Sequence, residues 1–125
     1  MSRESGQNGF RRVVVTGMGA VSPLGTAVDA TWEGLIACRS GVGPITAFDA
    51  SASGTRIAAA VKDFQVSDYM DTKEARRLSP FIHYAIAAAT EAMAQAHVDL
   101  AAEDPTRLGC EIGSAVGHNR PSHYN

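Results

Sequence analysis

Two cysteines and four histidines are the side chains in this sequence best suited to act as nucleophiles, bases or metal ligands. Cys38 follows an amphipathic helical pattern, so it would lie near the negative pole of a helix, which disfavours the reactive thiolate. Cys110 stands in a predicted buried strand, where a cysteine usually behaves as an inert small hydrophobe. We therefore predict that neither cysteine is a catalytic nucleophile.

The histidines show no spacing that suits a metal ion. His83 and His97 lie on one predicted helix but about four turns apart, and His118 and His123 belong to a polar C-terminal segment. Histidines that share an ion on one helix stand about one turn apart. We predict no metal, no cofactor and no catalytic residue in this chain.

A glycine-rich run near the N-terminus offers a different chemistry. Residues 13–15 are β-branched valines that predict a strand buried on both faces. Three glycines follow and allow a sharp turn or a close backbone approach, namely Gly17, Gly19 and Gly25. A dinucleotide-binding fingerprint would continue with a third glycine and open directly into a helix, but Ser22 and Pro23 stand there. A tight turn without a ligand is favoured, and a nucleotide-binding α/β domain is a lesser alternative.

Composition sets broad limits on the class of protein. The chain has 125 residues, 45% hydrophobic and 19% charged, which is typical of one globular domain. A net charge of −2 gives no reason to expect nucleic acid or an anionic membrane as a partner. Without an apolar run of membrane length, a signal peptide or a disulfide framework, a cytoplasmic protein is expected.

Two amphipathic or apolar helices must position these groups. The first is predicted over residues 26–38, with Val28, Trp32, Leu35 and Ile36 on one face, and it is expected to end at Arg39–Gly41. The second begins after the N-cap Ser79, has Pro80 at its first position and runs to about His97. Small and apolar residues cover most of its circumference, which predicts packing on several sides.

The remaining elements complete an α/β pattern. Short strands are predicted over residues 57–61 and 108–113, and a polar helix or turn over residues 67–78. The order predicts an α/β fold with a partly parallel sheet. These few elements leave the second helix without enough cover, so we expect further partners of this core to lie outside the chain.

Several motifs together resemble one known family. Residues 12–25 (RVVVTGMGAVSPLG) resemble the opening of the β-ketoacyl-acyl-carrier-protein synthases, nearest to their type II elongating branch, the 3-oxoacyl-ACP synthase 2 enzymes. The likeness covers residues 11–117 and continues in order through residues 31–35, 40–42, 48–49, 61–64, 73–77 and 107–117. It implies a thiolase-like fold layered α-β-α-β-α, of which this chain would hold part of the N-terminal half.

The resemblance also implies a reaction. Members condense an acyl thioester with malonyl-ACP in fatty acid biosynthesis, by a decarboxylating Claisen condensation at a cysteine supported by two histidines and a lysine. Those residues would lie beyond the matched part, so the chain is expected to be inactive alone. The alternative is a non-catalytic module that binds carrier protein. The implied partners are acyl carrier protein and, as in the family, a second copy in a homodimer.

Two sites within the chain follow from the resemblance. Lys73, Arg76 and Arg77 are spaced to form one basic helix face, and the matching family positions contact the acidic carrier protein. The alternative is an ordinary solvent-exposed helix face without a binding role, partly neutralised by Asp71 and Glu74. The second site is Val116, which matches a position, usually isoleucine, that borders the acyl-chain pocket.

The ends of the chain differ from its middle. We expect residues 1–10 to be a disordered tail, residues 11–117 a partial ketosynthase domain, and residues 118–125 a divergent unstructured tail. The divergence would fit a truncation, a frameshift or a gene-model error, and these stay open. Open sheet edges and uncovered apolar faces predict poor solubility and self-association.

Overall fold

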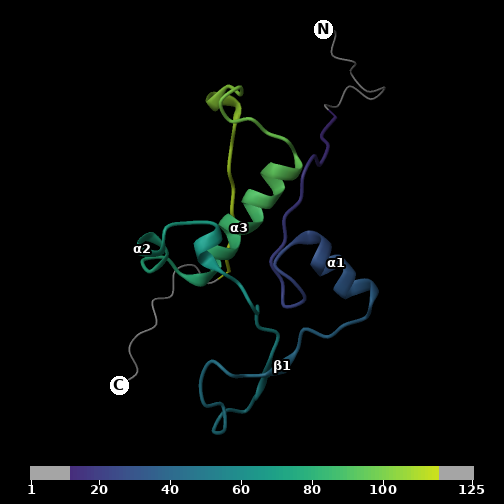
Figure 1. The fold of residues 1–125 in the computed structure, drawn as a ribbon, viewed down its shortest axis with the longest axis vertical. Coiled ribbons are helices and arrows are strands. Elements are labelled where there is room, and N and C mark those ends of the chain that lie inside the picture. Colours follow the sequence, from purple (N-terminus) through teal and green to yellow (C-terminus); the bar gives the residue numbers. More distant parts are fainter. Residues whose placement is uncertain (1–11, 116–125) are drawn as a thin grey trace.

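The computed structural model describes residues 12–115 as three helices with a small antiparallel sheet (Figure 1). The elements in chain order are α1 (Val28–Ile36), β1 (Gly43–Pro44), β2 (Ile57–Ala58), the 3-10 helix η1 (Val66–Asp68), α2 (Thr72–Ala75), α3 (Pro80–Gln95) and the 3-10 helix η2 (Pro105–Arg107). Figure 1 shows α3 in the middle, with α1 on one side and α2 on the other.

The central helix begins where the sequence predicts. Ser79 is its N-cap with extended backbone angles, and Pro80 occupies the first turn, where its missing N–H costs no hydrogen bond. The helix ends at Gln95, two residues before the predicted end. Among its described residues only Ala87 is fully buried, which agrees with the expectation that the elements of this chain give the helix too little cover. Most of the others are half-buried, and those at 80, 89, 90, 94 and 95 are exposed.

Both long helices end in a left-handed residue that is not glycine. After α1, Cys38 has φ 51°, its N–H bonds the oxygen of Leu35, and the Arg39 N–H bonds that of Gly34. After α3, His97 has φ 53° and the same pair of bonds closes the helix. This is the Schellman arrangement. The prediction that Gly41 ends the first helix is therefore wrong, since Cys38 takes that role.

The first helix turns the opposite face inward from the one predicted. Trp32 and Ile36, members of the expected apolar stripe, are 61% and 64% exposed. Gly34 is the buried residue of the helix, close to Leu24 of the preceding loop. The loop covers the small-residue face of α1, so the wide apolar side chains are left on the outside.

Two predicted strands do not form within residues 12–115. Residues 13–15 are exposed, with Val13 at 91%, and residues 108–113 are exposed as well. A strand needs a hydrogen-bonded neighbour, and the sheet in the described part of the chain contains only β1 and β2. Cys110 is consequently exposed, which corrects the prediction that it is buried.

The sheet that does form is short and antiparallel, in place of the predicted partly parallel one. Gly43 pairs with Ala58 and Pro44 with Ile57. The Ile45 N–H extends the pairing to the oxygen of Arg56 at 2.9 Å. The predicted strand over residues 57–61 is thus confirmed at its start and is shorter than expected. The predicted helix or turn over residues 67–78 is confirmed as η1 and α2.

Among residues 12–115, the helices are too short or too polar to cross a bilayer.

Candidate functional site

The glycine turn (residues 17–25) packs directly on α3. A Cβ atom at Gly17 would overlap the carbonyl oxygen of Ala92, and one at Gly19 would overlap that of Ala88. Any side chain at these two positions would push the turn away from the helix. Close backbone approach therefore explains Gly17 and Gly19, and it is one of the two roles that the sequence suggested for these glycines, beside a sharp turn.

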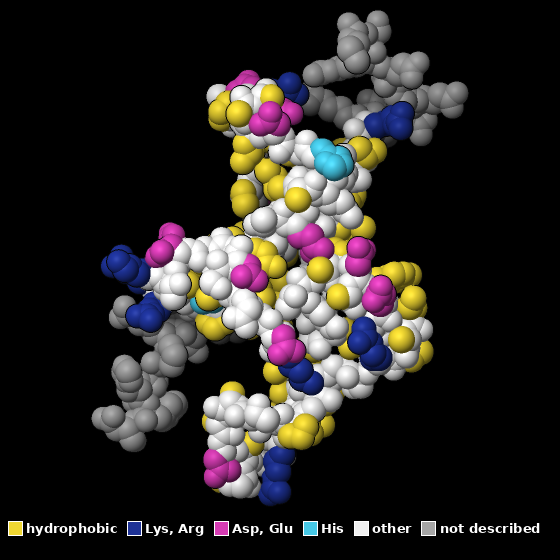
Figure 2. Space-filling model, viewed as in Figure 1, with side chains coloured by type: hydrophobic (Ala, Val, Ile, Leu, Met, Phe, Trp, Pro, Cys, Tyr) yellow, Lys and Arg dark blue, Asp and Glu magenta, His cyan; other side chains and the backbone are white. Residues whose placement is uncertain are grey.

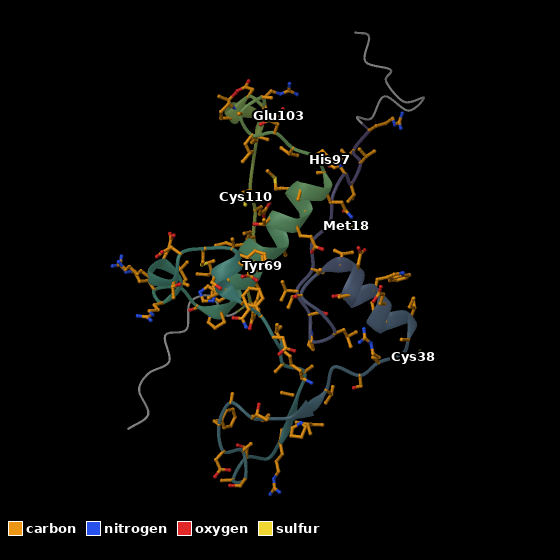
Figure 3. The ribbon with its side chains drawn as sticks, viewed as in Figure 1. Met18, Cys38, Tyr69, His97, Glu103 and Cys110 are labelled. Atoms are coloured by element: carbon orange, nitrogen blue, oxygen red, sulfur yellow. The ribbon has the colours of Figure 1, made fainter. Side chains whose placement is uncertain are left out.

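Two polar side chains of α3 accept the backbone N–H groups of this region. The Met18 N–H donates to Oε1 of Gln95 at 2.6 Å. The Glu91 carboxylate accepts two more, from Ala20 at 2.9 Å and from Val28, the first residue of α1, at 2.8 Å. Figure 3 shows Met18 on the segment that passes α3. One carboxylate therefore joins the glycine turn, α1 and α3.

This arrangement bears on the nucleotide alternative. A dinucleotide site needs backbone N–H groups of the glycine turn and the helix N-terminus aimed at a phosphate. Here those of Ala20 and Val28 already bind a carboxylate, which would also repel a phosphate. The site that an anion would occupy is filled from within the chain, so these residues act as scaffold.

Ser22 closes the end of the turn. Its backbone pairs with that of Gly25 in both directions, at 2.8 and 3.2 Å. Its hydroxyl lies 2.9 Å from that of Thr31 on α1 and accepts the N–H of Leu24 at 3.2 Å. The serine that breaks the nucleotide fingerprint is thus the residue that fastens the turn to α1.

The sequence carries a signal for this scaffold, although Glu91 and Gln95 were not among the predicted site residues. Glu91 and Gln95 stand four residues apart on a helix that is otherwise mainly apolar and small. Residues four apart on a helix share a face. Polar residues on such a face, beside a glycine-rich segment, indicate acceptors for backbone N–H groups.

The basic turn is the second candidate, and we define it as Lys73, Arg76 and Arg77. Lys73 lies in α2, Arg76 is its C-cap, and the Arg77 N–H continues the turn to the oxygen of Glu74 at 2.9 Å. All three basic side chains are exposed. Figure 2 shows Lys and Arg side chains projecting from the surface at α2.

Asp71 has a role other than neutralising this turn. Its carboxylate caps α2 by accepting the N–H groups of Lys73 at 2.8 Å and Glu74 at 3.4 Å. An N-cap aspartate satisfies backbone donors, and its negative charge interacts favourably with the positive N-terminal pole of the helix. One oxygen of this carboxylate is therefore bound to the backbone, while the three basic side chains are exposed.

Two further carboxylates act as caps in loops. A hydrogen bond from the backbone of Ser51 lowers the pKa of Asp49 below its usual value, and the Ser51 hydroxyl adds to this. The Thr106 hydroxyl, 2.8 Å from Asp104, lowers the pKa of that carboxyl in the same direction, and the backbone N–H of Thr106 adds to this. Both carboxylates stay ionised, which suits a cap and not a general acid.

The candidate nucleophiles and bases are not brought together. Cys38 lies at the end of α1, and Cys110 lies in the segment after η2, both exposed (Figure 3). His97 ends α3, whereas the ring of His83 bonds the Ala75 carbonyl oxygen. Residues 12–115 contain no group of three His, Cys, Asp or Glu placed to hold a metal. Val116, His118 and His123 lie outside the described residues.

Comparisons with known proteins agree on one family. The model described as "Beta-ketoacyl synthase, N-terminal domain" matches residues 10–125. The 3-oxoacyl-[acyl-carrier-protein] synthase 2 of Vibrio harveyi is 44% identical over 107 residues, which cover 86% of this chain and 26% of that enzyme. The enzyme of the same name from Synechocystis sp. is 40% identical with the same coverage of each chain.

A solved structure supports the fold. The ishigamide ketosynthase/chain length factor matches with a TM-score of 0.65 and 38% sequence identity, over 71% of this chain and 22% of that one. The chain spans about a quarter of the length of the curated relatives it matches, at 26%. The resemblance seen in the sequence is confirmed, and the ketosynthase-like fold is confirmed at the level of the shared core.

Proposed function

The chain belongs to the β-ketoacyl synthase family, within its N-terminal domain, and on this premise we propose that it is the N-terminal part of a 3-oxoacyl-ACP synthase. That enzyme would condense an acyl thioester with malonyl-ACP in fatty acid biosynthesis, with loss of carbon dioxide. The complete fold would be the five-layered thiolase-like one, with partner strands for the exposed segments 13–15 and 108–113. Val116 would border the acyl pocket.

This chain's own contribution would be a surface for acyl carrier protein. The observation that carries the proposal is the basic turn, whose three cations are exposed while Asp71 is engaged as a helix cap. Exposed cations of this kind attract an acidic partner and set its association rate more than its affinity. Binding should therefore be strongest at low salt and weaken as salt is added.

The direct test is a charge reversal with a matched control. Arg76→Glu with Arg77→Glu replaces two attractions by two repulsions, and like charges in contact oppose association itself, so the double variant should abolish measurable binding of carrier protein to the 125-residue chain at low salt. Arg12→Glu with Arg107→Glu changes the net charge equally at two other exposed positions, and it should bind like the unaltered chain. Equal binding by both double variants would refute the carrier surface.

Condensation by the chain alone is not expected. A ketosynthase needs a thiolate with a base and oxyanion donors around it. Cys38 and Cys110 are exposed on separate elements, and the His83 ring is engaged with a backbone carbonyl. Incubation with acyl and malonyl carrier proteins should give no 3-oxoacyl product above a blank without protein; turnover above that blank would contradict the proposal.

A non-catalytic carrier-binding module is the second candidate. One observation favours it: the basic turn lies within the described residues, which bring no nucleophile and base together. Carrier capture by the isolated chain without product would fit it.

Exposed free thiols suit a reducing compartment, so we place the protein in the cytoplasm. We also propose that the complete protein forms a homodimer, as in the family, and sedimentation analysis would measure this.

A further inference from the structure

The basic turn is tied to α3 through one carbonyl group. The oxygen of Ala75 lies 3.0 Å from Nε2 of His83 and also accepts the N–H of Leu78 at 3.1 Å. A carbonyl oxygen only accepts hydrogen bonds, so Nε2 carries the proton and donates it. Both acceptor positions of this oxygen are thus used, one by the turn itself and one by α3.

This carbonyl belongs to the peptide group that continues into Arg76. Because a peptide unit is planar, fixing the Ala75 oxygen also fixes the direction of the Arg76 N–H. That N–H bonds the oxygen of Thr72 at 3.3 Å and so closes the turn of α2. The His83 ring therefore constrains the backbone from which the two arginines project.

A group of aromatic rings supports the same region. The ring of Phe64 meets that of Tyr84 on α3 edge to face, with centroids 5.0 Å apart. It also stacks on Tyr69, between η1 and α2, with centroids 5.5 Å apart. Ala75 itself is only 4% exposed. The segment that leads into α2 and the residue that ends it are both held against the first half of α3.

We propose that His83 is a positioning residue for carrier-protein binding. Its bond to Ala75 would hold the basic turn in the orientation that acidic groups of the carrier meet, and this rests on the proposed carrier-binding function. Half-buried on α3, the ring acts on the carrier only through the turn. Prior ordering of a binding segment raises affinity because less conformational freedom is lost on association.

Two substitutions separate the hydrogen bond from the shape of the ring. His83→Leu keeps an apolar side chain of useful size but removes the donor. It should raise the carrier dissociation constant about three- to tenfold at low salt, the range expected for one hydrogen bond. In His83→Gln the amide nitrogen stands the same number of bonds from Cα as Nε2, so the donor returns and affinity should stay within about twofold.

A control about two turns farther along α3 accounts for general loss of stability. Glu91→Gln weakens the tie to the glycine turn and leaves α2 untouched, so carrier affinity should not change. Circular dichroism of every variant would confirm that helix content is retained. His83→Gln keeps the inference testable even if His83→Leu fails to fold.

The outcomes distinguish this inference from the proposed function. If reversal of Arg76 and Arg77 leaves carrier binding unchanged, the carrier surface itself is wrong. If that reversal abolishes binding but His83→Leu binds normally, the positioning role is overturned and the surface stands. Equal weakening by His83→Leu and His83→Gln would also overturn it, because the donated hydrogen bond would then not be the cause.

Discussion

The Glu91 carboxylate binds backbone groups of two segments outside its own helix. Its two oxygens accept the N–H groups of Ala20 and Val28, and so join three segments that are distant in sequence. Hydrogen bonds to a charged acceptor contribute more than neutral ones. The residue holds the glycine turn and the start of α1 against α3.

Removal of this carboxylate should loosen the glycine turn and α1 together. We expect Glu91→Ala to lower their local stability by about 2–4 kcal/mol, because two charge-assisted bonds are lost. Amide hydrogen exchange at Ala20 and Val28 measures this directly, since protection there reports local opening. Unchanged protection at both amides would show that the carboxylate is dispensable. The amides of β2 provide the internal control.

At the level of elements, helix starts were more predictable than helix surroundings. Ser79 and Pro80 predict the start of α3, because the preferences of the N-cap and the first turn do not depend on neighbouring elements. The strand at residues 13–15 and the cover of α3 depend on neighbours, and hydrophobic pattern alone cannot supply them. The inward face of α1 was mispredicted because the Ser22–Gly25 loop contacts its small residues, an arrangement that periodicity does not encode.

The end of α1 gives a prediction at this scale. Cys38 holds a left-handed conformation, with φ 51°, that costs a residue with a Cβ atom about 1 kcal/mol relative to glycine. Cys38→Gly should therefore stabilise α1 by about that amount, seen as slower exchange of its amides. Cys38→Ser keeps the Cβ atom and should give no gain. Equal stabilisation by both variants would point to loss of the thiol instead.

At the level of the whole molecule, large apolar side chains remain on the surface. Thirteen large hydrophobic residues within residues 12–115 are exposed, among them Val13, Trp32 and Ile36. Figure 2 shows hydrophobic side chains at many places on the visible face. Extensive exposed apolar surface marks sites of protein association. It accords with a chain that matches only 26% of the length of its curated relatives.

The isolated chain should therefore self-associate as its concentration rises. Trp32→Lys with Ile36→Glu should shift sedimentation velocity profiles toward the monomer without loss of helix content, because both side chains already face outward. A matched substitution at Ala30, which lies against Gly25, should instead disrupt the docking of α1. A monomer at every concentration, before any substitution, would contradict the expectation.

The family could be read from the sequence, whereas the roles of particular residues could not. The motif at residues 12–25 identifies the family, yet only the structure reveals that its glycines lie against α3 and its donors bind Glu91. The basic turn was predicted from spacing, and the tie from His83 was not. A histidine in a helix has no sequence signature for a carbonyl acceptor eight residues earlier.

We propose that a carrier protein meets this chain at the basic turn. The most direct measurement is a titration of the isotope-labelled 125-residue chain with acyl carrier protein at low salt, followed by amide NMR shifts. We predict that the largest changes fall on residues 71–78, around the basic turn, and fade as salt is added. Changes centred on α1 or on residues 13–15, with residues 71–78 unmoved, would contradict the account.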